Sequence, residues 1–170
     1  MRKFLTLLCL FALFSCQSES QDALKNIELK TPSGETIKTT LVFTPEEMQQ
    51  GLSGKQASDF SDQEGMMFFY LTDDEKHFWM PDTYFDLDLI YLDKDLKIID
   101  IIRKLPFYIG RANPELIPRA RSVWSRHVLE MKATSPISAN LKVGEQLVWK
   151  SRLSIQETEI QIKKKLNPSN

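Results

Sequence analysis

The sequence contains only two cysteines, Cys9 and Cys16, and both lie within its first sixteen residues. The rest of the chain therefore forms no internal disulfide and must be held together by a hydrophobic core. The chain has 170 residues, of which 42% are hydrophobic. This length is sufficient for one domain of ordinary size with a buried core.

An excess of positive charge is also absent. The 22 basic and 23 acidic residues give a formal net charge of −1. Because proteins that bind nucleic acid usually carry a basic surface, we expect no nucleic-acid partner. The sequence has no glycine-rich phosphate loop, and its two histidines, His77 and His127, lie far apart in the chain. We therefore expect no nucleotide, metal ion or other cofactor.

A long apolar run occurs only at the N-terminus. Arg2 and Lys3 precede the apolar-rich residues 4–14, and Ser15 and Cys16 follow them. This run is too short for a stable transmembrane helix, but it has the length of a signal-peptide core. We therefore expect a signal peptide over residues 1–15.

Residues 13–16, Leu-Phe-Ser-Cys, resemble a bacterial lipobox, in which the chain is cleaved before the cysteine and the thiol receives a lipid. The resemblance implies that Cys16 is lipidated and that residues 16–25 form a tether, at most about 30 Å long. The protein would then be exported and anchored to a membrane of the cell envelope. Gln17 favours the outer membrane, facing the periplasm, if the cell has two membranes. The alternative is ordinary secretory cleavage nearby, with an unmodified Cys16.

Alternating and apolar segments predict a mainly β domain over residues 26–162. Residues 27–30 and 36–43 are separated by turn residues and predict a hairpin. Further strands are predicted at residues 66–71, 86–92, 97–103, 123–131 and 146–150, with a weaker edge strand in the segment up to residue 162. Because no βαβ rhythm occurs, we expect an antiparallel sandwich or jelly-roll-like single domain.

One or two short helices are expected among these strands. Thr44 can cap a helix that begins at Pro45, and Glu47 can complete a capping box. Gly51 is expected to end this helix, because glycine tolerates a left-handed backbone there. Residues 135–143 predict one further helical turn.

The connections are predicted from polar and proline-rich segments. Residues 72–75 are predicted to form a turn, and residues 104–122 a long loop across one end of the sheet. Residues 163–170 contain three consecutive lysines and are expected to be a flexible tail.

Several blocks of the chain occur in the same order in a known family. They are Thr44-Pro45-Glu46-Glu47, Gly51-Leu52, Gly65-Met66-Met67-Phe68, Phe78-Trp79-Met80 with Thr83, Leu87-Asp88, Val128-Leu129-Glu130 and Gly144-Glu145. Over residues 27–150 the chain resembles the bacterial and archaeal family catalogued as domain of unknown function 192. The resemblance implies a mainly β, jelly-roll-like and often exported domain, and it brings no established activity.

A candidate ligand site is predicted around residues 78–92, where an aromatic cluster enters a turn and a strand with carboxylates leaves it. Trp79, Thr83, Asp88 and Glu130 combine an apolar wall with a few polar groups, as small-ligand sites usually do. We predict that these four residues bind a carbohydrate, a peptide or a partner protein without catalysis.

Two alternative functions stay open. A hydrolase of envelope glycans would use Asp86, Asp88 and Glu130. Asp86 and Asp88 would lie on one face of a strand about 6.5–7 Å apart, near the lower end of the carboxylate spacing in inverting glycosidases. In a purely structural accessory protein, Asp88 would instead accept hydrogen bonds from the backbone or from Thr83, and every motif residue would serve folding.

Two further arrangements of polar residues are chemically conceivable. A zinc site would combine His77 and His127 with Glu130 or Asp88, but the sequence has no close ligand spacing. A catalytic triad would combine Ser125, His127 and Asp88, but no nucleophile turn surrounds the serine. We expect neither.

Overall fold

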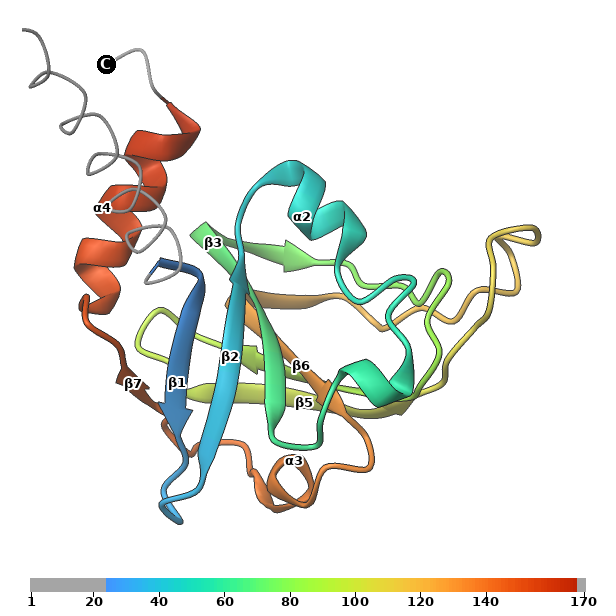
Figure 1. The fold of residues 1–170 in the computed structure, drawn as a ribbon, viewed down its shortest axis with the longest axis horizontal. Helices are drawn as coiled ribbons and strands as arrows, with labels where there is room; N and C mark the ends of the chain where they lie inside the picture. Colours follow the sequence, from blue (N-terminus) through green and yellow to red (C-terminus); the bar gives the residue numbers. More distant parts are fainter. Residues whose placement is uncertain (1–23, 168–170) are drawn as a thin grey trace, which may run out of the picture.

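Seven strands form one mixed sheet in the computed structural model, which describes residues 24–167 (Figure 1). The strands are β1 (Asn26–Lys30), β2 (Thr36–Val42), β3 (Glu64–Lys76), β4 (Leu87–Leu92), β5 (Ile98–Leu105), β6 (Val123–Lys132) and β7 (Val148–Lys150). Their order across the sheet is β5-β4-β6-β3-β2-β1-β7. The predicted fold class, a mainly β single domain, is confirmed.

One pair of neighbouring strands is parallel, although the sequence predicts an antiparallel arrangement. β1 and β2 form the predicted antiparallel hairpin, but β2 and β3 run in the same direction. The connection between them carries α2 (Pro45–Gln50) and the short 3-10 helix η1 (Ala57–Asp59). Parallel neighbours require such a crossover, because a tight turn always reverses the chain.

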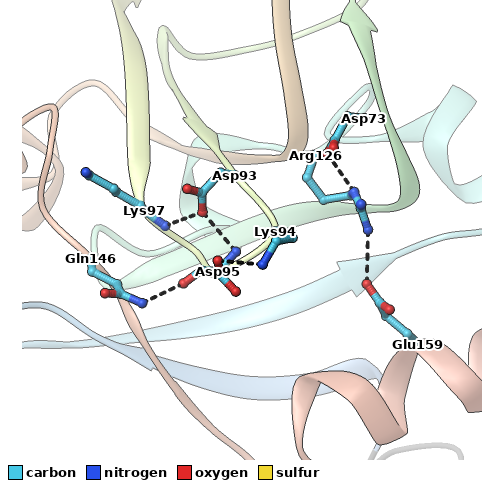
Figure 2. A network of polar contacts seen from close by, with 8 residues as sticks. All are labelled: Asp73, Asp93, Lys94, Asp95, Lys97, Arg126, Gln146 and Glu159. Carbon is cyan, nitrogen blue, oxygen red and sulfur yellow. Dashed lines mark hydrogen bonds and ion pairs between the residues drawn. The ribbon is translucent and has the colours of Figure 1, made fainter.

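The two ends of the sheet are joined by the segment that precedes β7. The N–H of Ile98 donates to the carbonyl of Glu145 at 2.7 Å, and the N–H of Leu147 donates to the carbonyl of Leu96 at 3.1 Å. The Gln146 side chain donates to a carbonyl in the β4–β5 turn at 2.9 Å (Figure 2). Because β5 and β7 are the outermost strands, these bonds curl the sheet into a sandwich-like fold.

Each face of the sheet packs against its own hydrophobic cluster. The first core includes Leu29, Ile37, Leu41, Met67, Phe69, Ile90, Leu92, Ile98, Leu129, Met131 and Ile162. The second core includes Val42, Leu52, Phe60, Met66, Phe68, Phe78, Met80, Leu87, Leu89, Tyr91, Leu105 and Val128. The alternation predicted for residues 123–131 is confirmed, because Leu129 and Val128 belong to different cores. Glu130 follows this alternation and lies on the face of the second core.

Helix α2 begins and ends as predicted. Thr44 Oγ1 accepts a hydrogen bond from the N–H of Glu47, and the Glu47 carboxylate accepts one from the N–H of Thr44. Gly51 ends the helix with a φ of 48°, which side chains with a Cβ rarely adopt. A Cβ at this glycine would lie 3.1 Å from the Phe68 ring. The end of α2 is therefore placed directly against the second core. The helical turn predicted within residues 135–143 is also present, as α3 (Pro136–Asn140), which Ser135 caps.

The weak edge strand predicted before residue 162 was wrong, because this segment forms helix α4 (Ile155–Leu166). Ser154 and Glu157 form a capping box, and the two buried residues, Thr158 and Ile162, are spaced four apart as on one helix face. The helix includes Lys163–Lys165, which were expected in a flexible tail. Arg126 of β6 ties α4 to the sheet.

The Arg126 contacts connect three elements. Its guanidinium donates to Asp73 of β3 at 2.8 Å and to Glu159 of α4 at 3.2 Å (Figure 2).

The turn predicted at residues 72–75 was wrong as well, because these residues belong to strand β3. β3 continues to Lys76 after a bulge between Phe69 and Asp74, and its second half pairs with β6. The polar sequence there reflects an exposed strand end, not a chain reversal.

The predicted signal peptide, Cys16 and the tether as far as residue 23 lie outside the described residues. Within residues 24–167, no helix has both the length and the apolar character needed to cross a membrane.

Candidate ligand site

A cavity of about 130 Å³ lies between α2, the segment of residues 77–83 and the sheet. Its apolar lining includes Phe68, Tyr70, Phe78, Trp79, Met80 and Leu87. Glu130 of β6 and Thr83 also line it. A hollow of about 620 Å³ beside Trp149 is larger, but no buried carboxylate lines it.

The segment of residues 77–83 is held in place by the long loop that precedes β6. The N–H of Met80 donates to the carbonyl of Pro118 at 3.1 Å, and the carbonyl of Phe78 accepts from Ala120 at 2.9 Å. Phe78 and Met80 are buried in the second core. Trp79 between them points away and is 42% exposed. Short-range alternation thus places Trp79 at the edge of the cavity.

Glu130 is the one ionisable side chain buried at this cavity. It lies in β6 between Met66 of β3 and Leu89 of β4, and it is 5% exposed. Among the described residues, none donates a hydrogen bond to its carboxyl group, and burial alone raises its pKa to about 8. The carboxyl group is therefore mostly protonated at neutral pH.

Several other polar side chains around the cavity have partners within the protein. Gln50 donates to a backbone carbonyl at 2.6 Å, and Ser53 donates to another at 2.6 Å. The Thr83 hydroxyl donates to the carbonyl of Met80 at 2.8 Å. His77 is exposed, and its Nδ1 shares a hydrogen bond of 2.7 Å with a serine hydroxyl. Buried polar groups in proteins are usually satisfied in this way, so the carboxyl of Glu130 stands out.

Asp88 does not lie at the cavity. Its carboxylate accepts hydrogen bonds from Arg103 at 2.7 Å, from Ser138 Oγ at 2.7 Å and from the N–H of Lys104 at 2.8 Å. Arg103 also donates to the carbonyl of Leu141 at 2.7 Å. This network joins β4, β5 and α3. The backbone bond to Asp88 matches the structural alternative, whereas Thr83 is not its donor.

Asp88 and Glu130, two of the three carboxylates proposed for a hydrolase, are not brought together. Asp88 aligns with Met131 and Glu130 aligns with Leu89, so the two carboxylates project from opposite faces of the sheet. Asp86 accepts a hydrogen bond from the N–H of Phe107 at 2.9 Å, at the start of the long loop. The spacing of Asp86 and Asp88 along the chain does not indicate where Glu130 lies relative to them.

The histidines occupy unrelated environments. His77 is on the surface, whereas His127 is fully buried with its ring 4.3 Å from that of Phe69. Neither ring nitrogen of His127 nor the hydroxyl of Ser125 has a hydrogen-bond partner within residues 24–167. The arrangement of Ser125, His127 and Asp88 as a triad is therefore not formed. No three His, Cys, Asp or Glu side chains of these residues are close enough to hold a metal ion.

Several lining residues were not predicted from the sequence. Tyr70 follows the alternation of β3 onto the second core, and burial together with the Glu130 charge raises its pKa to about 12. Met48 and Gln50 come from α2. The helix itself is recognisable from its capping box, but its docking against β3 depends on long-range packing. The glycine at position 51, where a Cβ would meet the Phe68 ring, is the local residue that could have indicated it.

Comparisons with known proteins agree with this fold. The chain belongs to the domain of unknown function 192 family, described as "Uncharacterized ACR", whose model matches residues 28–149. A comparison with curated proteins gave no match. A solved protein of unknown function from Novosphingobium aromaticivorans is 24% identical, with a TM-score of 0.58 over 73% of this chain and 84% of that one. A Sinorhizobium meliloti protein, described as a proposed transcription regulator, is 25% identical with a TM-score of 0.56, over 74% of this chain and 92% of that one.

Proposed function

We propose that this member of the domain of unknown function 192 family is a lipid-anchored protein of the cell envelope that binds a small ligand at the Glu130 cavity without catalysis. The observation that carries the proposal is the Glu130 carboxyl group, which is 5% exposed, lines a cavity and has no donor among the described residues. Burying a polar group without a partner costs free energy. A ligand that bonds to Glu130 would remove this cost.

The anchoring part of the proposal rests on the N-terminal sequence. Arg2 and Lys3, the apolar residues 4–14 and the Leu-Phe-Ser-Cys sequence ending at Cys16 together favour a lipidated, exported chain. In a cell with two membranes, Gln17 favours the outer membrane, with the domain in the periplasm. The acyl chains would supply the attachment, each buried methylene contributing about 0.8 kcal/mol.

Binding is favoured over hydrolysis by the positions of the carboxylates. Glu130 is the one buried carboxyl at the cavity, and Asp88 is neutralised by Arg103 on the opposite face. General acid and base catalysis by two carboxyl groups requires both to face one substrate. Of the four candidate residues, Trp79 and Glu130 offer free contact surface at the cavity. Thr83 and Asp88 are engaged in hydrogen bonds that support the fold.

The binding proposal is tested by a thermal-shift screen of the purified protein against glycans, peptides and amines. A ligand that binds only the folded state raises the melting temperature. We expect at least one class to raise it for wild type and for Asp86→Asn, and not for Glu130→Gln. If no compound shifts wild type, or if the shift persists in Glu130→Gln, the cavity is not the binding site.

The anchoring proposal is tested separately in cells. We expect wild type to be in the membrane fraction, with an intact mass that starts at Cys16 and includes a lipid. Cys16→Ser should leave this fraction. An unmodified wild-type chain cleaved near residue 16 would overturn the lipid anchor while leaving the binding proposal intact.

A further inference from the structure

We propose that the Glu130 cavity binds a primary ammonium group on a short alkyl chain, with the Glu130 carboxylate as its acceptor and the surrounding aromatic rings as its walls. The inference rests on the proposed function and names the ligand class of the same site. Its evidence is the lack of a counter-charge for Glu130, the aromatic lining and the size of the cavity.

Glu130 has no positively charged partner in the described part of the protein. Burial is the one cause of its raised pKa, so no cation there offsets the cost of ionisation. Cations on the neighbouring elements contact groups other than Glu130. Arg126 pairs with acidic side chains of β3 and α4, and Lys132 donates to a backbone carbonyl at 2.6 Å. A ligand that carries its own positive charge therefore supplies the counter-charge that Glu130 lacks in the described part of the protein.

The ionisable groups that face Glu130 do not replace such a ligand. Tyr70 and Tyr91 lie on the same face of the sheet, and burial raises the pKa of both phenols, so they remain neutral. Lys76 Nζ lies 3.8 Å from the centre of the Tyr70 ring. His77 at the opening is exposed and paired with a serine hydroxyl. Glu130 is thus the group that titrates on ligand binding.

The walls of the cavity suit a cation on a hydrocarbon chain. Phe68, Tyr70, Phe78 and Trp79 present aromatic rings, which attract cations through the negative charge of their faces. Two of these rings already hold cations of the protein. Arg119 lies 5.1 Å from the Trp79 ring centre, and a lysine ammonium lies over Tyr70. Methionine and leucine side chains, from Met48, Leu52, Met80 and Leu87, complete an apolar surface for methylene groups.

The volume of the cavity limits what can enter. It measures about 130 Å³, slightly less than a cavity of about 150 Å³ that accommodates benzene. An alkylammonium with about five heavy atoms fits this space, whereas a hexose with about twelve does not. A sugar could contact only the exposed ring of Trp79 at the opening.

The protonation of Glu130 gives the binding a characteristic pH dependence. An ammonium ligand binds the ionised carboxylate, and the apparent dissociation constant equals the intrinsic one divided by the ionised fraction. With a pKa of about 8, this fraction rises about tenfold from pH 6 to pH 7 and changes little above pH 9. Affinity should therefore increase about tenfold over the first interval. A neutral ligand lacks this dependence.

The experiment is a calorimetric titration of the purified protein with n-butylammonium and with 1-butanol, which has a similar shape and no charge. Titrations at pH 6, 7 and 9 are made on wild type, on Glu130→Gln and on Glu46→Gln, a control that removes an exposed carboxylate of α2. We expect n-butylammonium to bind wild type and the control with the stated pH dependence. Glu130→Gln should lose at least tenfold in affinity for n-butylammonium and not for 1-butanol.

A second arm distinguishes the two sources of this group. Nα-acetyl-lysine methylamide is titrated beside n-butylammonium. Tighter binding of the lysine derivative assigns the site to a lysine side chain of a peptide, and equal binding assigns it to a free alkylamine. Both outcomes support the proposal that the ligand is an ammonium. Equal affinity for 1-butanol and n-butylammonium, or unchanged n-butylammonium binding in Glu130→Gln, overturns the proposal that the ligand is an ammonium. Binding of 1-butanol alone overturns it while retaining a ligand site. Binding of neither amine overturns it too, and the wider thermal-shift screen then decides the proposed function.

Discussion

Asp88 of β4 and Glu130 of β6 are one position out of register and lie on opposite faces of the same sheet. Asp88 accepts three hydrogen bonds, one of them from a guanidinium, whereas the Glu130 carboxyl group has no donor within residues 24–167. The two acids therefore differ in role despite similar burial. Asp88 stabilises the junction of β4, β5 and α3, and Glu130 is available to a ligand.

The first prediction concerns the Asp88 network. Asp88→Asn removes the negative charge that Arg103 and Ser138 Oγ contact, and it leaves the guanidinium without its counter-ion. We expect a loss of about 2–4 kcal/mol in the free energy of unfolding, measured with urea. Asp86→Asn is the matched control, because Asp86 accepts a single bond from an exposed loop, and it should lose less than about 1 kcal/mol. Equal losses for the two variants would contradict the proposed network.

The second prediction concerns the pH dependence that Glu130 gives to stability. Its pKa is about 8 in the folded protein and near 4.5 in the unfolded chain, so the folded state holds the proton more tightly. Stability should therefore fall as the pH rises from 4.5 to 8 and level off above this range. Glu130→Gln removes this fall.

Urea unfolding of wild type and Glu130→Gln between pH 5 and pH 9 measures the effect. Relative to wild type, the variant should gain stability with increasing pH, by no more than about 5 kcal/mol in total. Identical pH profiles for the two proteins would show that Glu130 is already ionised in the folded state.

The third prediction concerns His127, which titrates in the opposite sense. Burial, together with the nearby charge of Arg126, lowers the pKa of His127 to about 3. Below the ordinary histidine pKa of 6.5, His127 is protonated in the unfolded chain but stays neutral in the folded protein. Stability is therefore lost as the pH falls from 6.5 toward 3. His127→Phe keeps a ring against Phe69 and removes two ring nitrogens that have no partner in the described chain.

His127→Phe should therefore be within about 1 kcal/mol of wild type at pH 7, since no hydrogen bond is lost. At pH 4 it should be more stable than wild type. Thermal unfolding followed by circular dichroism at the two pH values measures both. A variant that loses as much stability at pH 4 as wild type does would assign the acid sensitivity to other groups.

The fourth prediction concerns α4. Ile162 is fully buried in the first core, and Ile160 on the same helix is exposed. Ile162→Ala should lower the free energy of unfolding by about 2–5 kcal/mol, because it removes packed methylene groups and leaves a cavity. Ile160→Ala makes the same chemical change and should have an effect below about 1 kcal/mol. Similar effects would mean that α4 does not pack on the sheet.

Features that depend on interactions between residues close in the chain could be predicted from the sequence. Helix α2 was predicted with its cap and its end, because Thr44, Glu47 and Gly51 act over about two turns of the chain. The faces of β6 were predicted because the alternation of its residues is also local. Helix α4 was missed because the prediction rested on a weak alternation and did not consider the capping box that Ser154 and Glu157 form.

Features that depend on contacts between distant parts of the chain could not be predicted from the sequence. All six residues of β4 are buried, so its apolar pattern does not indicate which core Asp88 faces. The parallel pairing of β2 with β3 and the docking of α2 over β3 depend on contacts between distant segments. Trp79 and Glu130 were predicted as candidates, but the packing of the second core is what brings both to one cavity.

The pairing of β1 with β7 joins the first and last strands of the sheet. Synthesis proceeds from the N-terminus, so β1 cannot pair with β7, its second neighbour, until nearly the whole chain has been made. Pairing across such a long stretch of chain raises the contact order and slows folding. For a protein exported as proposed here, this delay would be useful, because the sheet cannot be completed before residue 150 has been made and the incomplete chain would remain available for export.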